Sequence, residues 1–371
     1  MQQRLLAPSL SGSVTIFAYL SLIASLPLLG LWLAGKPLSA YLQFPPRPHP
    51  VEPAAFSWPV FVFTALAVVA CLAPFISKIL AARNIPTVDS RRSRRFSSFG
   101  WLGLVMTGLT WFLAWNRFEW FEPLQGFTFT PLWLGYILTM NALSLRRGGY
   151  CLLTHRVGYL LALFPLSAVF WWGFEYLNRF AANWRYVGLE DCTAFQYFVQ
   201  SSLPFSTVLP AVCSTVEWLG TFPALSRGLD RFRPMPSATA RSCGRAGLGV
   251  GAFLLLSMPI WPHLLYPFVW FAPLLLISGL QTLFGQQTPL IKALTTGDFR
   301  RLWTFALASL VCGFFWELWN YESLAHWEYD IPYVGCCKLF EMPILGYSGY
   351  LPFGLICAAF ADCLKPTHDR T

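Results

Sequence analysis

The stretch Phe314-Phe-Trp-Glu-Leu-Trp-Asn320 ends a long apolar run, and Trp327-Glu-Tyr329 and then Leu351-Pro352 follow it. Glu317 and Asn320 are three residues apart, so they lie on one face if the run is helical. A carboxylate at the end of an apolar run is costly unless it is paired or hydrated. The stretch therefore predicts a membrane helix that ends in a polar site.

The same pattern occurs once more, earlier in the chain. Glu175 and Asn178 end another apolar run, Trp184-Arg-Tyr186 follows them, and Leu209-Pro210 comes later. The separation between the glutamate and the proline is 35 residues in both copies. Because the residue types and their separations match, the sequence predicts an internal repeat, a feature of many membrane proteins.

The composition indicates an integral membrane protein. Of the 371 residues, 56% are hydrophobic and 12% are charged, whereas a soluble domain has about 25% charged residues. The net charge of +9 comes from Lys and Arg in short loops between apolar runs, where the positive-inside rule places them. A nucleic-acid partner is therefore not expected.

The remaining motifs predict neither a metal nor a cofactor. The five His are dispersed, and the ten Cys form no pair at metal-ligand spacing. No Gly-rich phosphate-binding loop occurs, so nucleotide use is not expected. Cys192 and the pair Cys336-Cys337 would lie in equivalent loops of the repeat, which leaves a disulfide between them open.

Apolar runs of about 20 residues predict an all-α, polytopic transmembrane bundle of about ten spans. The expected spans are Val14–Leu33, Trp58–Ile79, Phe99–Trp115, Phe129–Leu145, Val157–Leu177, Phe195–Leu219, Leu248–Trp261, Leu264–Phe284, Leu302–Asn320 and Ile344–Ala361. The longest polar stretch, 220–245, is predicted to be a basic cytoplasmic linker between membrane halves 1–219 and 246–371.

Charge alternates along these loops. The loops after the second, fourth, sixth and eighth spans are basic, whereas those after the third, fifth and ninth carry the acids. The positive-inside rule then places Arg83–Arg95 and Gly220–Arg245 in the cytoplasm, together with both termini. We therefore expect a multi-pass protein of the cell inner (cytoplasmic) membrane. The fifth and ninth spans run in the same direction, so the repeat (spans five–six and nine–ten) is predicted to be parallel.

The repeated residues predict one site near the outer membrane face. Its candidate catalytic residues are Glu175 and Glu317. Its candidate substrate-binding residues are Asn178, Asn320, Trp172, Trp184, Trp316, Trp327, Tyr186 and Tyr329. Two structural roles are open alternatives: the carboxylates could fix helix packing through hydrogen bonds, and the Trp side chains could form an interfacial aromatic belt.

The chemistry of such a site suits a hydrophobic substrate. A carboxyl group in a poorly hydrated space can hold its proton near neutral pH, and aromatic faces stabilise cations. Together they suit acid-catalysed protonation of a lipid or isoprenoid-like molecule, with membrane lipid as the expected partner. The alternatives are a transporter or permease for a small or hydrophobic solute and a non-catalytic membrane subunit.

Three runs carry a resemblance to known proteins. They are the runs at 315–320 and 341–354, Glu-Met-Pro-Ile-Leu-Gly-Tyr-Ser-Gly-Tyr-Leu-Pro-Phe-Gly in the latter, and Thr-Phe-Thr-Pro-Leu-Trp-Leu-Gly-Tyr at 128–136. They resemble an uncharacterised family of bacterial polytopic membrane proteins, which implies the fold but no activity. Trp316-Glu317 is also similar to the small integral-membrane terpene and carotenoid cyclases, which place acidic residues beside Trp in a helical bundle.

Overall fold

The computed structural model describes residues 10–46, 54–86, 95–189 and 192–364, and most of them are helical. The α-helices are α1 (Leu10–Leu33), α2 (Leu38–Tyr41), α3 (Trp58–Ala81), α4 (Ser98–Trp115), α5 (Phe129–Gly148), α6 (Leu152–His155), α7 (Val157–Ala181), α8 (Ala194–Phe205), α9 (Val208–Gly220), α10 (Ser237–Ser257), α11 (Pro262–Leu265), α12 (Ala272–Leu283), α13 (Pro289–Thr296), α14 (Arg300–Tyr321) and α15 (Tyr350–Cys363).

Short 3₁₀ helices and strands connect these helices. The 3₁₀ helices are η1 (Glu119–Phe127), η2 (Pro223–Ser226), η3 (Tyr266–Val269) and η4 (Ile344–Gly349). The strands are β1 (Trp184–Val187), β2 (His326–Tyr329), β3 (Lys338–Leu339) and β4 (Met342–Pro343), and they pair as two small antiparallel sheets, β1–β2 and β3–β4. These sheets were not part of the predicted all-α fold.

Six of the described helical segments are long and apolar enough to span a membrane. They are Gly12–Leu33, α3, α4, α7, α14 and Ile344–Cys363, and the bent pair Pro262–Val269 and Ala272–Leu283 adds a seventh if it is one span. These segments are those of a multi-pass membrane protein. The other predicted spans, Phe129–Leu145, Phe195–Leu219 and Leu248–Trp261, are largely helical without meeting the same test, so the number ten stays a prediction.

Two of the predicted spans are broken by proline. Ser206 and Thr207 separate α8 from α9 within the predicted sixth span. Pro210, in the first turn of α9, has no N–H and its ring would clash with the carbonyl of Ser206, so a continuous helix is disfavoured there. The predicted eighth span bends by 54° just before α12, whose first turn contains Pro273.

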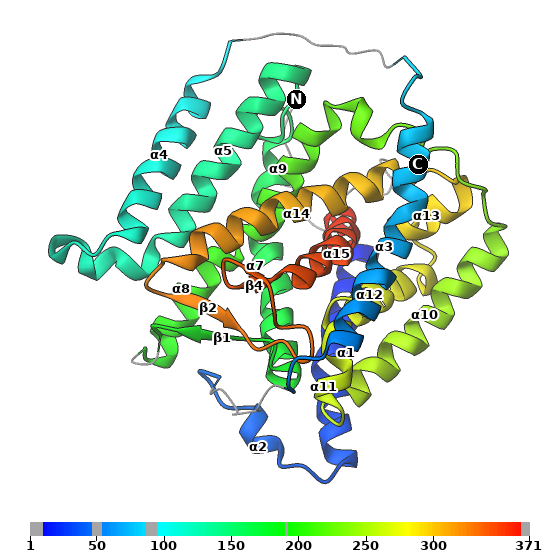
Figure 1. The fold of residues 1–371 in the computed structure, drawn as a ribbon, viewed down its shortest axis with the longest axis horizontal. Coiled ribbons are helices and arrows are strands. Elements are labelled where there is room, and N and C mark those ends of the chain that lie inside the picture. The colour runs from blue at the N-terminus through cyan, green and yellow to red at the C-terminus, as the bar shows by residue number, and fades with distance from the viewer. Residues whose placement is uncertain (1–9, 47–53, 87–94, 190–191, 365–371) are drawn as a thin grey trace.

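Glycines allow the closest helix contacts. An added Cβ at Gly103 in α4 would lie 2.7 Å from the carbonyl oxygen of Gly135 in α5. At Gly354 in α15 it would lie 2.3 Å from the carbonyl oxygen of Phe305 in α14. Backbones approach this closely where a side chain is missing. Figure 1 shows α4 and α5 side by side at one edge, and α14 and α15 nearer the middle.

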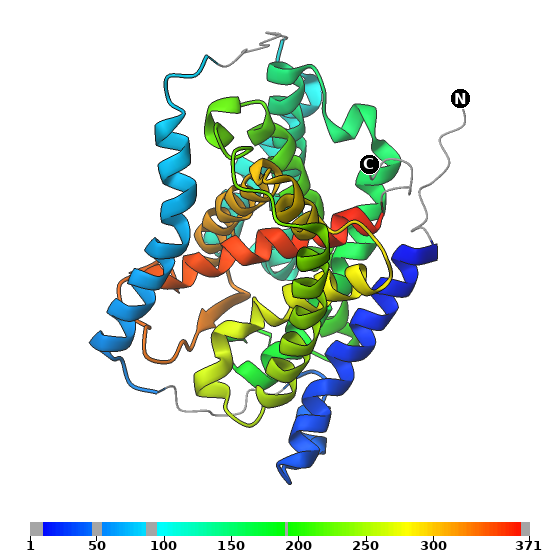
Figure 2. The same ribbon diagram turned by 90° about the vertical axis from the view of Figure 1, so that its right-hand side faces the viewer.

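Helix α3 lies at the periphery. Figure 2 shows α3 along one edge of the molecule and α1 along the opposite edge. None of the apolar window of α3 is buried. Its C-terminal end is attached to the bundle, because Phe75 stacks on Trp303 with ring centroids 5.4 Å apart and Lys78 donates to the carbonyl of Arg231. Its exposed apolar length suits contact with lipid.

Loops meet at two ends of the bundle. At one end, the Arg227 guanidinium donates to the carbonyl of Arg83. Each of these arginines belongs to a loop predicted to be cytoplasmic, although Arg91, Arg92 and Arg94 of the first loop lie outside the described residues.

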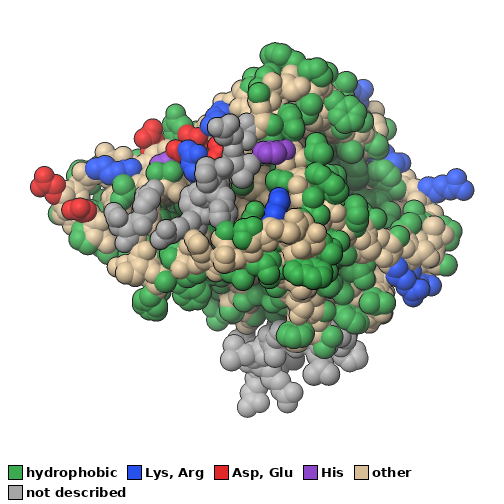
Figure 3. Space-filling view, turned by 90° about the horizontal axis from the view of Figure 1, so that it is seen from below, with side chains coloured by type: hydrophobic (Ala, Val, Ile, Leu, Met, Phe, Trp, Pro, Cys, Tyr) green, Lys and Arg blue, Asp and Glu red, His purple; other side chains and the backbone are tan. Residues whose placement is uncertain are grey.

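The other end carries the β1–β2 sheet. There, Arg117 donates to the carbonyl of Glu322 over 2.7 Å, and Asn183 donates to that of Tyr266 over 3.2 Å. Figure 3 shows the molecule from below in the view of Figure 1, with acidic side chains gathered toward one side. Most of the other coloured side chains in that view are hydrophobic.

Candidate functional site

Two asparagines hold the segments that follow α7 and α14. The Asn320 amide accepts from the backbone N–H of Trp327 and donates to its carbonyl, both over 2.7 Å. Asn178 binds Trp184 in the same way, with its amide nitrogen 2.7 Å from the carbonyl oxygen and its amide oxygen 3.3 Å from the N–H. Each asparagine therefore fixes the path of the chain at a strand, which is a positioning role.

These segments pair with each other as an antiparallel sheet, here named the aromatic ribbon (β1 and β2). Trp184 lies opposite Tyr329, and Tyr186 lies opposite Trp327. Successive side chains of a strand point to opposite faces, so the four aromatic rings share one face. On the other face Arg185 forms ion pairs with Glu328 and Asp330, and its side chain is 47% exposed. The ribbon is thus amphipathic.

Glu175 lies beneath the aromatic face of the ribbon. One of its carboxylate oxygens accepts from the indole N–H groups of Trp171 and Trp184, over 3.0 and 3.2 Å, and from the hydroxyl of Tyr186 over 2.6 Å. The side chain is buried. Trp171 lies one turn before Glu175 on α7, so the helix and the ribbon each supply donors to the same oxygen.

Glu317 has a matching place beside β2. One carboxylate oxygen accepts from the hydroxyls of Tyr329 and Tyr350, over 2.7 and 2.6 Å. The indole N–H of Trp327 donates in turn to Tyr329 over 2.8 Å. The second oxygen, Oε2, is buried and has no hydrogen-bond partner among the described residues. Glu317 is therefore the less satisfied of the two carboxyl groups.

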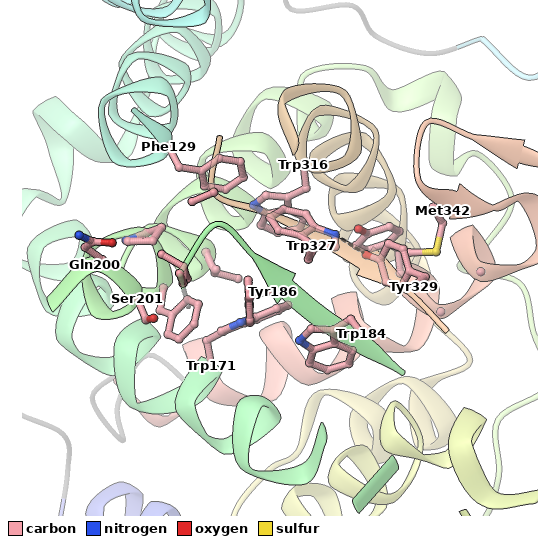
Figure 4. Close-up of a pocket in the computed structure, with 18 of the residues that line it drawn as sticks. Phe129, Trp171, Trp184, Tyr186, Gln200, Ser201, Trp316, Trp327, Tyr329 and Met342 are labelled. Atoms are coloured by element: carbon pink, nitrogen blue, oxygen red, sulfur yellow. Dashed lines mark hydrogen bonds between the residues drawn. The ribbon is translucent and has the colours of Figure 1, made fainter. Parts of the chain in front are cut away.

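Aromatic rings from both copies enclose one space, here named the aromatic cavity. It has a volume of about 110 Å³. Its described lining residues are Gly126, Phe129, Trp171, Trp184, Tyr186, Leu189, Gln200, Ser201, Pro204, Phe205, Val208, Trp270, Trp316, Ala325, Trp327, Tyr329, Met342, Gly346, Gly349 and Tyr350. Figure 4 shows rings from α7, α14 and both strands of the ribbon gathered around it.

The structure brings most of the predicted site residues to this cavity. Trp184, Trp316, Trp327, Tyr186 and Tyr329 line it. Glu175 and Glu317 lie one hydrogen bond behind the lining, through their tyrosine and tryptophan donors. Their proposed catalytic role and the substrate-binding role of the asparagines stay predictions.

Trp172 lies apart from the lining. Its indole N–H donates to Ser202 over 3.0 Å, and its ring stacks on Phe198 with centroids 5.7 Å apart. It therefore packs α7 against α8.

Sequence reasoning missed five aromatic rings of the cavity, those of Phe129, Trp171, Phe205, Trp270 and Tyr350. Trp171 is separated from Glu175 by one helical turn, and this spacing was a signal that could have identified it. Tyr350 directly precedes the second Leu-Pro motif, Leu351-Pro352. Trp270 follows the short helix η3 and stacks on Trp184 with ring centroids 5.9 Å apart, a contact that no local pattern indicates.

The ribbon tyrosines remain protonated. Burial raises the pKa of Tyr186 well above its usual value, and the neighbouring Glu175 raises it further. Burial and the neighbouring Glu317 raise the pKa of Tyr329 in the same way. Both hydroxyls therefore keep a proton to donate to a carboxylate.

Cysteine and metal-ligand geometry adds little to this site. The Cys192 thiol donates to Gln200 over 3.6 Å, and the sulfur atoms of Cys336 and Cys337 lie 3.3 Å from each other. Cys192 therefore lies beside Gln200, and Cys336 lies beside Cys337. Among the described residues, no group of three or more His, Cys, Asp or Glu side chains could hold a metal ion.

Comparison with protein-family models, with curated proteins and with solved structures finds no match for this chain.

Proposed function

We propose that this chain crosses the inner membrane ten times with both termini in the cytoplasm. The contacts between loops support this topology. Arg227 and Arg83 connect two loops that are predicted inside, whereas Arg117 and Glu322 connect two that are predicted outside. The alternation of basic and acidic loops supports the same orientation.

Cysteine labelling tests this topology. In a background without the native cysteines, a membrane-impermeant thiol reagent added to intact cells should label Leu189→Cys and leave Pro236→Cys unlabelled. Both positions should be labelled once the membrane is permeabilised, which controls for accessibility. Labelling of residue 236 but not of residue 189 in intact cells would reverse the proposed orientation.

The proposal includes a parallel repeat of α7 to α9 and α14 to α15. Trp184 pairs with Tyr329 as Trp327 pairs with Tyr186, and a two-fold relation between copies would produce this register. Ser167 and Ser309 each precede the glutamate of their copy by eight residues. Each serine hydroxyl donates to the backbone near the start of the following Leu-Pro helix.

Within this architecture, the chain acts on a lipid or isoprenoid-like molecule by acid chemistry. The observation that carries this proposal is that two buried carboxyl groups are hydrogen-bonded to tyrosines that line an apolar, aromatic cavity. With Glu317 protonated, the hydroxyl of Tyr329 or Tyr350, which donates to Glu317 in the structure, would turn toward the cavity and accept the proton of Glu317 on its oxygen. The tyrosine hydroxyl proton would pass to an alkene or epoxide, which leaves a carboxylate and a cationic substrate beside aromatic faces.

Glutamine substitution separates chemistry from packing. Glu317→Gln keeps the size of the side chain and removes its titrating group, so lipid conversion should fall by about 100-fold or more. Lipid extracts of a deletion strain carrying each variant should be compared by mass spectrometry. Glu122→Gln is the matched control, because Glu122 is an exposed glutamate of η1.

The Glu317→Gln experiment distinguishes a chemical role of the carboxyl group from a packing role. If Glu317→Gln restores the wild-type lipids at equal expression and equal thermal stability, the carboxyl group has a packing role and the proposed acid chemistry is wrong. Loss of conversion with unchanged melting temperature would support the proposal.

A transporter of a hydrophobic solute is the second candidate. The helix pair that ends with η3 and continues as α12 is bent by 54°, and Trp270, which lies at this break, lines the cavity. Broken helices at a binding site are typical of transporters. The same lipid extracts discriminate between the two functions, since an enzyme changes the chemical identity of a lipid and a transporter changes only its distribution.

A further inference from the structure

The aromatic cavity has the chemistry of a cation site. Five of its lining residues are tryptophans and three are tyrosines, namely Trp171, Trp184, Trp270, Trp316, Trp327, Tyr186, Tyr329 and Tyr350. No Lys, Arg or His is among its described lining residues. The face of an aromatic ring carries negative electrostatic potential and attracts cations, and quaternary ammonium groups are bound by cages of such rings.

The rings contact one another as a connected wall. Trp184 stacks on Trp270 at a centroid distance of 5.9 Å, and Trp316 stacks on Tyr350 at the same distance. Trp171 connects these two pairs, because its ring lies 6.5 Å from that of Trp184 and 6.4 Å from that of Trp316. A bound group would therefore meet tryptophans supplied by both copies and by the segment after η3.

The directions of the hydrogen bonds in the cavity wall suit the same ligand. Tyr186, Tyr329 and Tyr350 donate their hydroxyl protons to the carboxylates behind them. Tyr329 already accepts from the indole N–H of Trp327, and the other oxygen lone pairs of these hydroxyls are acceptors. An ionised glutamate adds a negative charge within a few ångströms of the lining. The cavity thus offers π-faces and acceptor oxygens, with carboxylates one hydrogen bond behind them.

Nearby cations are already engaged. Arg185 lies on the opposite face of the ribbon and pairs with Glu328 and Asp330. Arg179, one turn after Glu175, donates to the carbonyls of Tyr41 and Gln43. At the position equivalent to Arg179, Glu317 is followed by Tyr321. Glu317 therefore lacks the arginine that follows Glu175 by one turn and that would offset its charge.

We propose that the aromatic cavity binds a quaternary ammonium group carried on an apolar chain. The cavity volume of about 110 Å³ suits a compact head group, while an attached chain would extend beyond it. This inference rests on the proposed function, because both place the ligand in the aromatic cavity. It adds the chemical class of that ligand. It does not require that Glu317 transfer a proton.

Calorimetric titration of the full-length protein tests the proposal. The protein is placed in nanodiscs of phosphatidylethanolamine and phosphatidylglycerol, which contain no quaternary ammonium group. The probes are choline and dimethylbutanol, its neutral isostere with carbon in place of the quaternary nitrogen. Choline should bind at least about tenfold more tightly than the alcohol, because cation–π attraction acts on the charged probe alone. Equal affinities, or no choline binding, would overturn the proposal.

Variants locate the binding. Trp270→Leu removes a lining ring that is not among the described hydrogen-bond donors to Glu175 or Glu317, and it should weaken choline binding by about tenfold. Trp270→Phe, which keeps an aromatic face, should retain part of the affinity. The matched control is Trp101→Leu, since Trp101 is 60% exposed on α4. Equal loss in Trp101→Leu and Trp270→Leu, both folded, would contradict binding in the cavity.

Two further comparisons separate the sources of the ligand and the two proposals. Decyltrimethylammonium binding more tightly than choline identifies a lipid-like ligand, whereas equal binding identifies a free solute and contradicts the apolar chain. Choline selectivity in a protein whose Glu317→Gln variant keeps full function would support this inference and overturn the acid chemistry. If the lipids change in Glu317→Gln but the protein does not prefer choline, the acid chemistry is supported and the quaternary ammonium site is overturned.

Discussion

Gly354→Val is expected to lower the free energy of unfolding by about 3 kcal/mol, because it forces side-chain atoms into the contact between α14 and α15. A Cβ at this position would lie 2.3 Å from the carbonyl oxygen of Phe305 and 2.5 Å from the hydroxyl oxygen of Ser309. The first neighbour is backbone, so the helices must move apart. Tyr350, one turn earlier on α15, would then shift away from Glu317.

Thermal unfolding in detergent measures this effect, and Gly108→Ala provides the control. Gly108 also lies within a helix, α4, but nothing is within 4 Å of an added Cβ there. Its replacement by alanine should be neutral or stabilising by up to about 1 kcal/mol, since alanine favours helix more than glycine does. A Gly354→Val protein that melts with the wild type would mean that the α14–α15 contact can relax without cost.

The sequence predicted the helical, membrane-spanning character of the chain well, because apolar length and low charge report directly on the membrane as solvent. The internal repeat around Glu175 and Glu317 stays a prediction. Hydropathy did not locate the break between α8 and α9 near Pro210, because hydropathy is insensitive to a missing N–H.

The aromatic ribbon could have been predicted. Trp184-Arg-Tyr186-Val and His326-Trp-Glu-Tyr329 alternate between aromatic and other side chains, which is the period of a strand. The all-α prediction places both segments in loops instead. Their pairing depends on contacts across more than a hundred residues, and no local pattern determines such a register.

The order of groups at the site could not be predicted either. Spacing on a helix shows that Glu317 and Asn320 share a face, but it does not show what covers that face. In the structure the ribbon covers it, so the amide of Asn320 binds backbone and the carboxylate of Glu317 receives Tyr329 and Tyr350. The glutamates therefore lie behind the cavity wall, and the side chains that donate hydrogen bonds to them form the wall.

Asn320→Ala is expected to destabilise the protein by about 2–4 kcal/mol, because it leaves the backbone N–H and carbonyl of Trp327 without their partner. Asn320 is fully buried, so water does not readily replace the amide. The ribbon should then detach from α14, with Trp327 and Tyr329 leaving the cavity wall. Limited proteolysis should cut the segment between α14 and β3 sooner than in the wild type.

Asn116→Ala is the matched control, since Asn116 directly follows α4 and its amide donates to the carbonyl of Phe112 in the last turn of that helix, at an exposed site. Its effect should stay within about 0.5 kcal/mol. Asn320→Asp sharpens the test, because it keeps an acceptor for the Trp327 N–H but replaces the donor to the Trp327 carbonyl and buries a carboxyl group. It should be at least as destabilising as alanine. If both Asn320 variants melt and resist protease like Asn116→Ala, the ribbon is held by its aromatic contacts, and the asparagine does not position it.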